Sequence, residues 1–164
     1  MSIISLFTDG SVNPQLNIGF GAYLILSQDL IYSDDLQSNI QLKKFEDTSS
    51  TKLELQTLLW AINSNDFIGK KVIVYTDCQN ILGLLNRRER FIKNNYYSKS
   101  GKLIANHELY KEFYKLIDSL DFEFIKVKGH KTSSKKDDID KIFTLVDKGS
   151  RTYLRDYINK LQDN

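Results

Sequence analysis

Four carboxylates in this sequence lie next to or within apolar segments, where acidic residues are unusual, and not in polar segments. Asp9 and Asp77 each follow directly on a short apolar run, whereas Glu54 and Asp147 lie within apolar patterns of helical spacing. Taken singly, each has an ordinary structural interpretation as a helix cap or as an acid near a helix start. Brought to one place, four carboxylates would repel each other, and hard divalent cations remove that repulsion. The set therefore predicts an oxygen-rich metal site of the kind that Mg²⁺ prefers.

A site of this kind beside basic surface predicts phosphoryl chemistry. Two divalent ions held about 3.5–4 Å apart stabilise both the attacking and the leaving oxygen of an in-line displacement. The attacking group would be a metal-bound water, so the chemistry requires no nucleophilic serine or cysteine, and the protein supplies positioning and charge neutralisation. Two Mg²⁺ ions are the expected cofactor, and Mn²⁺ could substitute because it also accepts oxygen ligands.

The net charge of +2 conceals two basic clusters. Residues 87–102 hold six basic residues against one acid, with Phe91, Tyr96 and Tyr97 interleaved, and residues 126–136 hold five lysines and no acid. Either cluster alone could equally be a charged surface that is exposed to solvent and binds no partner. Because both flank candidate catalytic residues, we expect a nucleic acid as the partner, bound with salt-sensitive affinity.

Length and composition place the chain among globular proteins. Its 164 residues, 41% hydrophobic and 27% charged, suffice for one domain with its own core. No apolar run approaches the roughly 18 residues of a membrane helix, and the first residues do not have the pattern of a secretory signal. The single cysteine, Cys78, cannot build a disulfide framework. We expect a cytoplasmic protein without a membrane contact, and a monomer.

The spacing of apolar residues predicts the element order β-β-β-α-β-α-α-β-α. The expected strands cover residues 2–8, 19–27, 31–45, 70–76 and 121–129, and the expected helices start at residue 50 and cover 78–87, 105–120 and 138–161. This order implies an α/β domain with a mixed sheet covered by helices. Ligands gather at the carboxyl ends of strands in such sheets, where we expect the first strand to end on Asp9 and the fourth on Asp77. Gly10 would then let the backbone turn close to a phosphate.

The segments around these carboxylates resemble the ordered motifs of type 1 ribonucleases H. The motifs are FTDGS (7–11) with GFGAYL (19–24), STKLEL (50–55), YTDCQ (75–79), KVKGHK (126–131) and VDKGSR (146–151). The resemblance implies a ribonuclease H-like fold: a five-stranded mixed sheet, three antiparallel strands then two parallel, flanked by helices in one catalytic domain, 1–164. It implies an endonuclease that hydrolyses the RNA strand of RNA–DNA hybrids. It also implies that the metal-binding and catalytic carboxylates are Asp9, Glu54, Asp77 and Asp147.

Further positions match the family outside the carboxylates. His130 stands where the family has a mobile loop histidine that assists proton transfer or product release, so the resemblance implies a catalytic role. The minor groove of the hybrid displays the 2′-hydroxyls that distinguish RNA from DNA. The substrate-binding positions implied by the resemblance, each of which could equally be an ordinary polar loop or cap residue, are Gly10, Ser11, Asn13, Ser50, Thr51 and Gln79.

The chain departs from the family between His130 and Asp147. These two residues are seventeen positions apart, more than is usual in the family, which makes Asp138 and Asp140 rivals for the fourth metal ligand. We favour Asp147, because it lies in an apolar helical frame and Arg151 four residues later matches the family's ending. Asp138 and Asp140 are instead typical of a helix start, where acids are favoured by the helix dipole.

Two other functions remain open at this point. A catalytically inactive ribonuclease H-like module would bind nucleic acid or a protein partner, and a nuclease of the same fold would cut DNA. The presence of all four carboxylates favours an enzyme over an inactive module. The GHK segment (129–131) and the TDCQ segment (76–79) favour a hybrid over DNA as the substrate.

Overall fold

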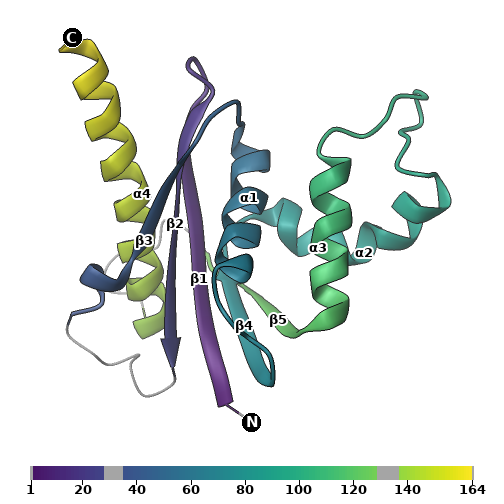
Figure 1. The fold of residues 1–164 in the computed structure, drawn as a ribbon, viewed down its shortest axis with the longest axis horizontal. Coiled ribbons are helices and arrows are strands. Elements are labelled where there is room, and N and C mark those ends of the chain that lie inside the picture. The colour runs from purple at the N-terminus through teal and green to yellow at the C-terminus, as the bar shows by residue number, and fades with distance from the viewer. Residues whose placement is uncertain (1, 28–34, 129–136, 164) are drawn as a thin grey trace.

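The computed structural model of the protein describes residues 2–27, 35–128 and 137–163 (Figure 1). Its strands are β1 (Ser2–Asn13), β2 (Ile18–Ser27), β3 (Gln41–Phe45), β4 (Lys70–Thr76) and β5 (Asp121–Lys126). Its helices are α1 (Ser50–Asn63), α2 (Gln79–Lys93), α3 (His107–Ser119) and α4 (Asp138–Gln162), with a 3-10 turn, η2, at Gln37–Asn39. No helix in these segments is long and apolar enough to cross a lipid bilayer.

The strands form one five-stranded mixed sheet in the order β3-β2-β1-β4-β5. The pairs β1/β2 and β2/β3 are antiparallel, whereas β1/β4 and β4/β5 are parallel. The predicted element order and the mixed sheet are therefore confirmed. β4 has the bounds predicted for it, because its alternating valines and flanking lysines mark a short buried strand without ambiguity.

Helices cover both faces of the sheet, and each face has its own core. α1, α2 and α3 lie on one side and α4 lies on the other (Figure 1). Successive residues of a strand point to opposite faces. Leu6 of β1 accordingly packs in the core under α1 and α2, and the next residue, Phe7, packs in the core under α4. β1 is thus buried from both sides, and the residues that follow Phe7 lie between the two helical layers.

The prediction that the first strand ends at Asp9 is wrong. The parallel pairing of β1 with β4 ends at Phe7 opposite Tyr75, but the antiparallel pairing with β2 continues to Asn13 opposite Ile18. Asp9 therefore lies inside β1, just beyond the point where β4 stops pairing with it. Gly10 lies in the same extended strand opposite Gly21 and forms no turn.

Small residues in β1 and β2 let α1 approach the sheet closely. A Cβ atom added at Gly10 would lie 2.9 Å from Leu53 Cδ2, and one added at Gly21 would lie 2.2 Å from Thr57 Oγ1. Neither distance is compatible with a real side chain at the helix position observed. The glycines therefore bring α1, and with it Glu54, down onto the strand that carries Asp9.

Several element bounds differ from the prediction. α2 continues to Lys93 instead of ending at residue 87, because its apolar positions extend to the buried Phe91. The third strand is limited to Gln41–Phe45, and η2 occupies part of the predicted range 31–45, of which 31–34 lie outside the described residues. β5 ends at Lys126 instead of 129. α4 begins at Asp138, as predicted, with Asp137 as its N-cap.

Candidate metal centre

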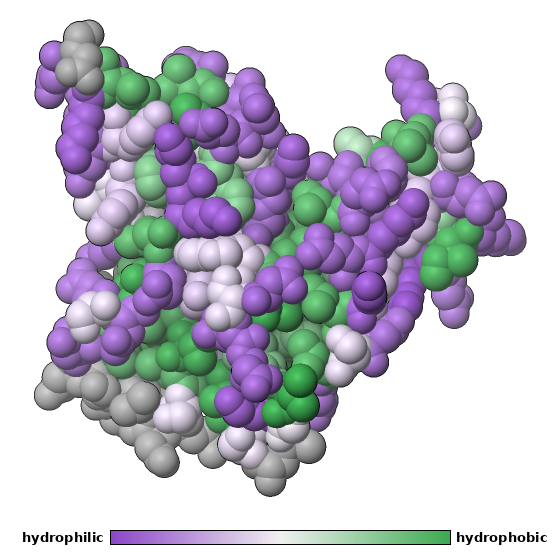
Figure 2. Space-filling view, in the orientation of Figure 1, coloured by the Kyte–Doolittle hydropathy of each residue, from purple (hydrophilic) through white to green (hydrophobic). Residues whose placement is uncertain are grey.

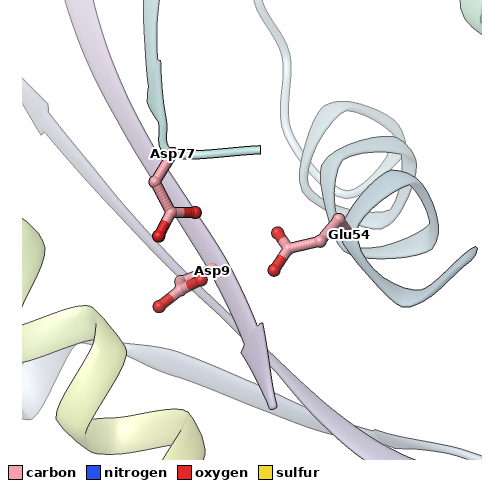
Figure 3. Close-up of side chains that lie close together, drawn as sticks. All are labelled: Asp9, Glu54 and Asp77. Carbon is pink, nitrogen blue, oxygen red and sulfur yellow. The ribbon is translucent and has the colours of Figure 1, made fainter. Parts of the chain in front are cut away.

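Three carboxylates from three different elements converge at the carboxyl end of the parallel strands. Asp9 lies on β1, Glu54 on α1 and Asp77 directly after β4, and their side chains point toward one another (Figure 3). One carboxylate oxygen of each lies within 4.8 Å of those of the other two. Asp9 is only 4% exposed, whereas Asp77 is exposed, so the cluster opens to solvent on the Asp77 side.

The strand register explains why Asp9 and Asp77 meet. Phe7 and Tyr75 are parallel partners, and each aspartate comes two residues after its member of this pair. The two side chains thus leave adjacent strands at the same level. Glu54 joins them because α1 lies close to the sheet, and the backbone of Gly10 hydrogen-bonds its carboxylate.

Burial, together with the neighbouring carboxylates, raises the pKa of two of these groups. Burial, followed by the negative charge of Glu54, raises the pKa of Asp9 from 3.8 to about 10. Burial, followed by the charge of Asp77, raises the pKa of Glu54 from 4.5 to about 8. Without a cation, the cluster therefore retains protons at neutral pH, because burial and the mutual repulsion of the carboxylates disfavour the charged forms.

The donor set fits a hard divalent cation. Glu54 Oε2 is buried and, among the described residues, has no hydrogen-bond partner. An unsatisfied buried oxygen of this kind is costly, and a cation beside it would satisfy the oxygen and relieve the repulsion. The three clustered residues supply carboxylate oxygens, the ligands that Mg²⁺ and Mn²⁺ accept. The residues present thus suit the metal that the sequence predicts.

Asp147 lies at the edge of this cluster. α4 passes beside Asp9 (Figure 3), and the Asp9 carboxyl hydrogen-bonds Asp147. Asp147 Oδ2 also accepts a hydrogen bond of 2.7 Å from Arg151 Nη2, one helical turn later. Asp147 is not among the three tightly clustered residues, so in this arrangement it contacts the cluster through Asp9.

Asp140, the alternative candidate for the fourth metal ligand, hydrogen-bonds the residues at the start of α4. It is 7% exposed, and its Oδ2 accepts from the backbone of Asp137 at 3.3 Å, while its own N–H donates to Asp137 Oδ1 at 2.8 Å. This reciprocal capping box fixes the start of α4. Asp138 is exposed in the same first turn. The structure thus brings Asp147 beside Asp9 and places Asp140 and Asp138 at the helix start.

The structure places the predicted substrate-binding side chains in different settings. Ser50 and Thr51 are exposed in the first turn of α1, whose N-cap is Ser49. Gln79 is exposed as the first residue of α2, and its Oε1 accepts from Lys126 Nζ at 3.0 Å. Ser50 and Thr51 thus lie on the helix that carries Glu54, and Gln79 begins the helix that follows Asp77 by two residues; all three side chains are accessible.

Ser11 and Asn13 are engaged within the protein. Asn13 Oδ1 accepts from the backbone N–H groups of Gln15 and Leu16, each at 3.0 Å, which holds the turn between β1 and β2. Ser11 Oγ lies 3.0 Å from Ser150 Oγ. Ser150 is a residue that the sequence motifs did not single out. Its position three residues after Asp147, on the same helix face, is the signal that could have identified it. His130 lies outside the described residues.

The raised pKa values predict that the metal-free protein loses stability as pH rises. In the folded state Asp9 and Glu54 keep protons that the unfolded chain has already lost, so the folded state binds more protons between about pH 4 and 8. The free energy of unfolding should therefore fall by about 1–3 kcal/mol per pH unit across this window in EDTA, because each of the two groups contributes up to about 1.4 kcal/mol per pH unit. Urea unfolding at pH 5, 6, 7 and 8 measures the slope. Adding Mg²⁺ should restore most stability at pH 8, and a curve in EDTA that is flat or rises with pH would contradict the expectation.

Comparisons with known proteins identify the family of this chain. The family model for RNase H matches residues 1–145. Ribonuclease H of Clostridium botulinum strain Hall is 28% identical over 150 residues, covering 87% of this chain and 93% of that protein. Ribonuclease H of Acetivibrio thermocellus is 29% identical over 151 residues, covering 88% and 94%. Ribonuclease H of Caldicellulosiruptor saccharolyticus is 28% identical over 145 residues, covering 87% and 94%.

Solved structures share the fold at low sequence identity. LC9-RNase H1, described as a type 1 RNase H with the type 2 active-site motif, matches with a TM-score of 0.67 at 17% identity, covering 92% of this chain and 71% of that chain. A foamy viral protease-reverse transcriptase solved in complex with dsDNA matches with a TM-score of 0.62 at 11% identity, covering 92% and 94%. The chain therefore belongs to the RNase H family and is a ribonuclease H-type hydrolase with the fold of that family.

Proposed function

We propose that this protein is an endonuclease that hydrolyses the RNA strand of RNA–DNA hybrids with two divalent cations, Mg²⁺ foremost, and that residues 1–164 act as one catalytic domain. The observation that carries the proposal is the convergence of Asp9, Glu54 and Asp77, with Asp147 bonded to Asp9, in a chain of the RNase H family. When bound, such cations activate water and neutralise the charge that develops on the scissile phosphate.

The position of each carboxylate indicates how it would take part in binding the cations. Asp9 is buried at the centre of the cluster and is the residue in contact with all the others, so it would contact both cations. Glu54 and Asp77 would complete the site toward α1 and β4, and Asp147 would complete it toward α4. The Gly10 backbone and the Arg151 side chain, which bond Glu54 and Asp147, hold these carboxylates in place before substrate arrives.

Gln79 is suited to contact the minor groove. Lys126 can only donate, so the bond between Lys126 Nζ and Gln79 Oε1 fixes the oxygen of the amide toward the lysine. The Nε2 group of Gln79 then remains as the donor available to a substrate. Every base pair presents acceptors in the minor groove, which makes such a donor tolerant of sequence. This tolerance suits a nuclease that recognises the type of duplex and not a base sequence.

A basic arm follows the helix that begins two residues after Asp77. The end of α2 and the loop 94–106 project from the body, and the space-filling view shows a hollow between this arm and α1 (Figure 2). Arg90, Lys93, Lys99 and Lys102 are exposed on this arm, with the half-exposed Tyr97 among them. Neutralising backbone phosphates with such residues gives affinity independent of sequence and sensitive to salt. We propose that the hybrid spans from the carboxylate cluster to this arm.

The assay for this function compares three duplexes and one variant. We expect Mg²⁺ to support cleavage of a labelled RNA strand in an RNA–DNA hybrid, while the DNA strand of that hybrid, a DNA duplex and an RNA duplex stay intact. Asp77→Asn should lower the rate by about 10²–10³-fold, because it removes one charged ligand from the cluster. Asp77 is exposed, so the variant should fold like the parent, with a melting temperature in EDTA no lower than that of the parent, which thermal unfolding checks.

Each alternative function has its own outcome in this assay. Binding of the hybrid without cleavage would indicate an inactive module. Cleavage of the DNA duplex at the rate of the hybrid would indicate a DNA-directed nuclease. An Asp77→Asn variant as active as the parent would contradict the assignment of the carboxylate cluster as the catalytic site.

A further inference from the structure

A pair of serine hydroxyls links the strand and the helix that carry two of the carboxylates. Ser11 Oγ of β1 and Ser150 Oγ of α4 lie 3.0 Å apart, and Ser150 is fully buried. Ser150 Oγ also donates to the backbone carbonyl of Asp147 at 3.0 Å. A hydroxyl has one proton to donate, so Ser150 must accept its second bond from Ser11. The result is a directed chain from Ser11 to Ser150 to the Asp147 carbonyl.

These hydrogen bonds lie next to the contact between Asp9 and Asp147. Ser11 comes two residues after Asp9 in an extended strand, so both side chains lie on the face of β1 that α4 covers. Ser150 comes three residues after Asp147, so both lie on one side of α4. The serine pair therefore joins the two elements immediately beside the place where their carboxylates meet.

The link opposes a repulsion that the carboxylates create. Asp9 on β1 and Asp147 on α4 are both carboxylates that act on each other electrostatically, and like charges on two packed elements repel. A bond between neutral hydroxyls holds the elements together without adding charge to the cluster. Arg151, which bonds the Asp147 carboxylate at 2.7 Å, restrains the side chain but lies on an exposed surface.

We propose that Ser150 is a positioning residue that fixes Asp147 relative to Asp9 and thereby sets the affinity of this centre for Mg²⁺. The inference rests on the proposed function, in which Asp147 is a metal ligand. Ser150 itself touches neither the cation nor the substrate, and it acts through the backbone carbonyl of Asp147. Ser11, implied by the family resemblance to contact the substrate, serves in this inference as the strand-side anchor of the link.

The test measures Mg²⁺ affinity in the folded protein and not activity alone. The dependence of thermal unfolding on Mg²⁺ concentration gives an apparent Kd for each variant. Ser150→Ala should weaken Mg²⁺ binding about three- to tenfold, the factor expected for one buried hydrogen bond. Ser11→Ala breaks the same link from the strand side and should weaken Mg²⁺ binding in the same direction, which keeps the test valid should Ser150→Ala fold poorly.

Thr57→Ala is the matched control. Thr57 is also fully buried on a helix that carries a carboxylate of the cluster, and its hydroxyl donates to the Leu53 carbonyl of the same helix at 2.8 Å. Its removal should lower the melting temperature and leave the Mg²⁺ affinity unchanged. Equal weakening of Mg²⁺ binding by Thr57→Ala and Ser150→Ala would show a general loss of stability and would overturn the inference.

A double-variant cycle isolates the route through Asp147. In an Asp147→Asn background, Ser150→Ala should have no further effect on the apparent Kd for Mg²⁺, because the group that it positions no longer binds as a carboxylate. An unchanged Kd for Ser150→Ala overturns the inference. The same change in Kd with and without Asp147→Asn also overturns it. In both cases the proposed function stands, provided that the parent binds Mg²⁺ and cleaves the hybrid. A parent that binds no Mg²⁺ overturns the inference and the proposed function together.

Discussion

Asp9→Asn is expected to stabilise the metal-free protein and to abolish its hydrolytic activity. Asp9 is buried, and its pKa is raised to about 10 by burial and then by the neighbouring carboxylates, so folding at pH 8 requires Asp9 to take up a proton that the unfolded chain has lost. A neutral amide of the same shape removes that cost, and the free energy of unfolding in EDTA at pH 8 should rise by about 2–4 kcal/mol. Hybrid cleavage should fall by about 10²–10³-fold or more, because the residue that joins the cluster no longer binds a cation.

Asp140→Asn is the matched control for this prediction. Asp140 is nearly as buried as Asp9, but its carboxylate accepts from the Asp137 backbone in the capping box of α4. Its replacement should lower the free energy of unfolding by about 1 kcal/mol and leave cleavage within a few-fold of the parent. A destabilised Asp9→Asn variant, or a loss of cleavage in Asp140→Asn as large as that in Asp9→Asn, would contradict the placement of these two acids.

Gly21→Ala is expected to be the most disruptive single-methyl change near the site. The new Cβ would lie 2.2 Å from Thr57 Oγ1 and 3.0 Å from Thr57 Cβ and Cγ2, and Thr57 is fully buried. α1 would have to move away from the sheet, which should lower the free energy of unfolding by about 2–3 kcal/mol. Glu54 lies one helical turn before Thr57, so cleavage should fall by about 10²-fold even in the folded fraction.

Two further variants show whether close packing is the cause. Gly149→Ala adds the same methyl inside α4, where the nearest side-chain atom is Ile40 Cγ2 at 3.6 Å, and it should raise stability by up to about 1 kcal/mol. Thr57→Ala combined with Gly21→Ala removes the two outer Thr57 atoms and should recover part of the lost stability. A Gly21→Ala protein as stable as the parent, measured by urea unfolding, would show that α1 is not held as close to the sheet as described.

The convergence of the carboxylates follows from features that are visible in the sequence. Apolar runs that stop at Asp9 and Asp77 predict that both acids lie at the carboxyl ends of strands of one sheet, and the apolar residues around Glu54 predict a helix. Strand alternation and helix periodicity are local properties that hold after folding, and the pairing of β1 with β4 then places the two aspartates at one level beside Glu54. The preference for Asp147 over Asp140 rested on the same periodicity, and the structure does place Asp147 beside Asp9.

What the sequence did not predict depends on contacts between distant segments. β1 runs past Asp9 because β2 continues to pair with it, and the apolar pattern of β1 alone contains no sign of this. Gly10 consequently serves the approach of α1 instead of a turn. The bond between Ser11 and Ser150 joins residues 139 positions apart and depends on how α4 is rotated over the sheet. The family resemblance implies a substrate contact for Ser11 and carries no information about this bond, because residue types alone do not identify a partner in the folded chain.

The most direct test of the central claim is hybrid cleavage in a single preparation with the metal removed and restored. A labelled RNA strand paired with DNA is incubated with the protein in EDTA, and excess Mg²⁺ is then added to the same reaction. We predict no cleavage of the RNA in EDTA, and cleavage at internal positions of the RNA strand alone after Mg²⁺ is added. RNA that stays intact after Mg²⁺ is added, or that is cut equally well in EDTA, would contradict the assignment of the carboxylate cluster as a metal-dependent nuclease centre.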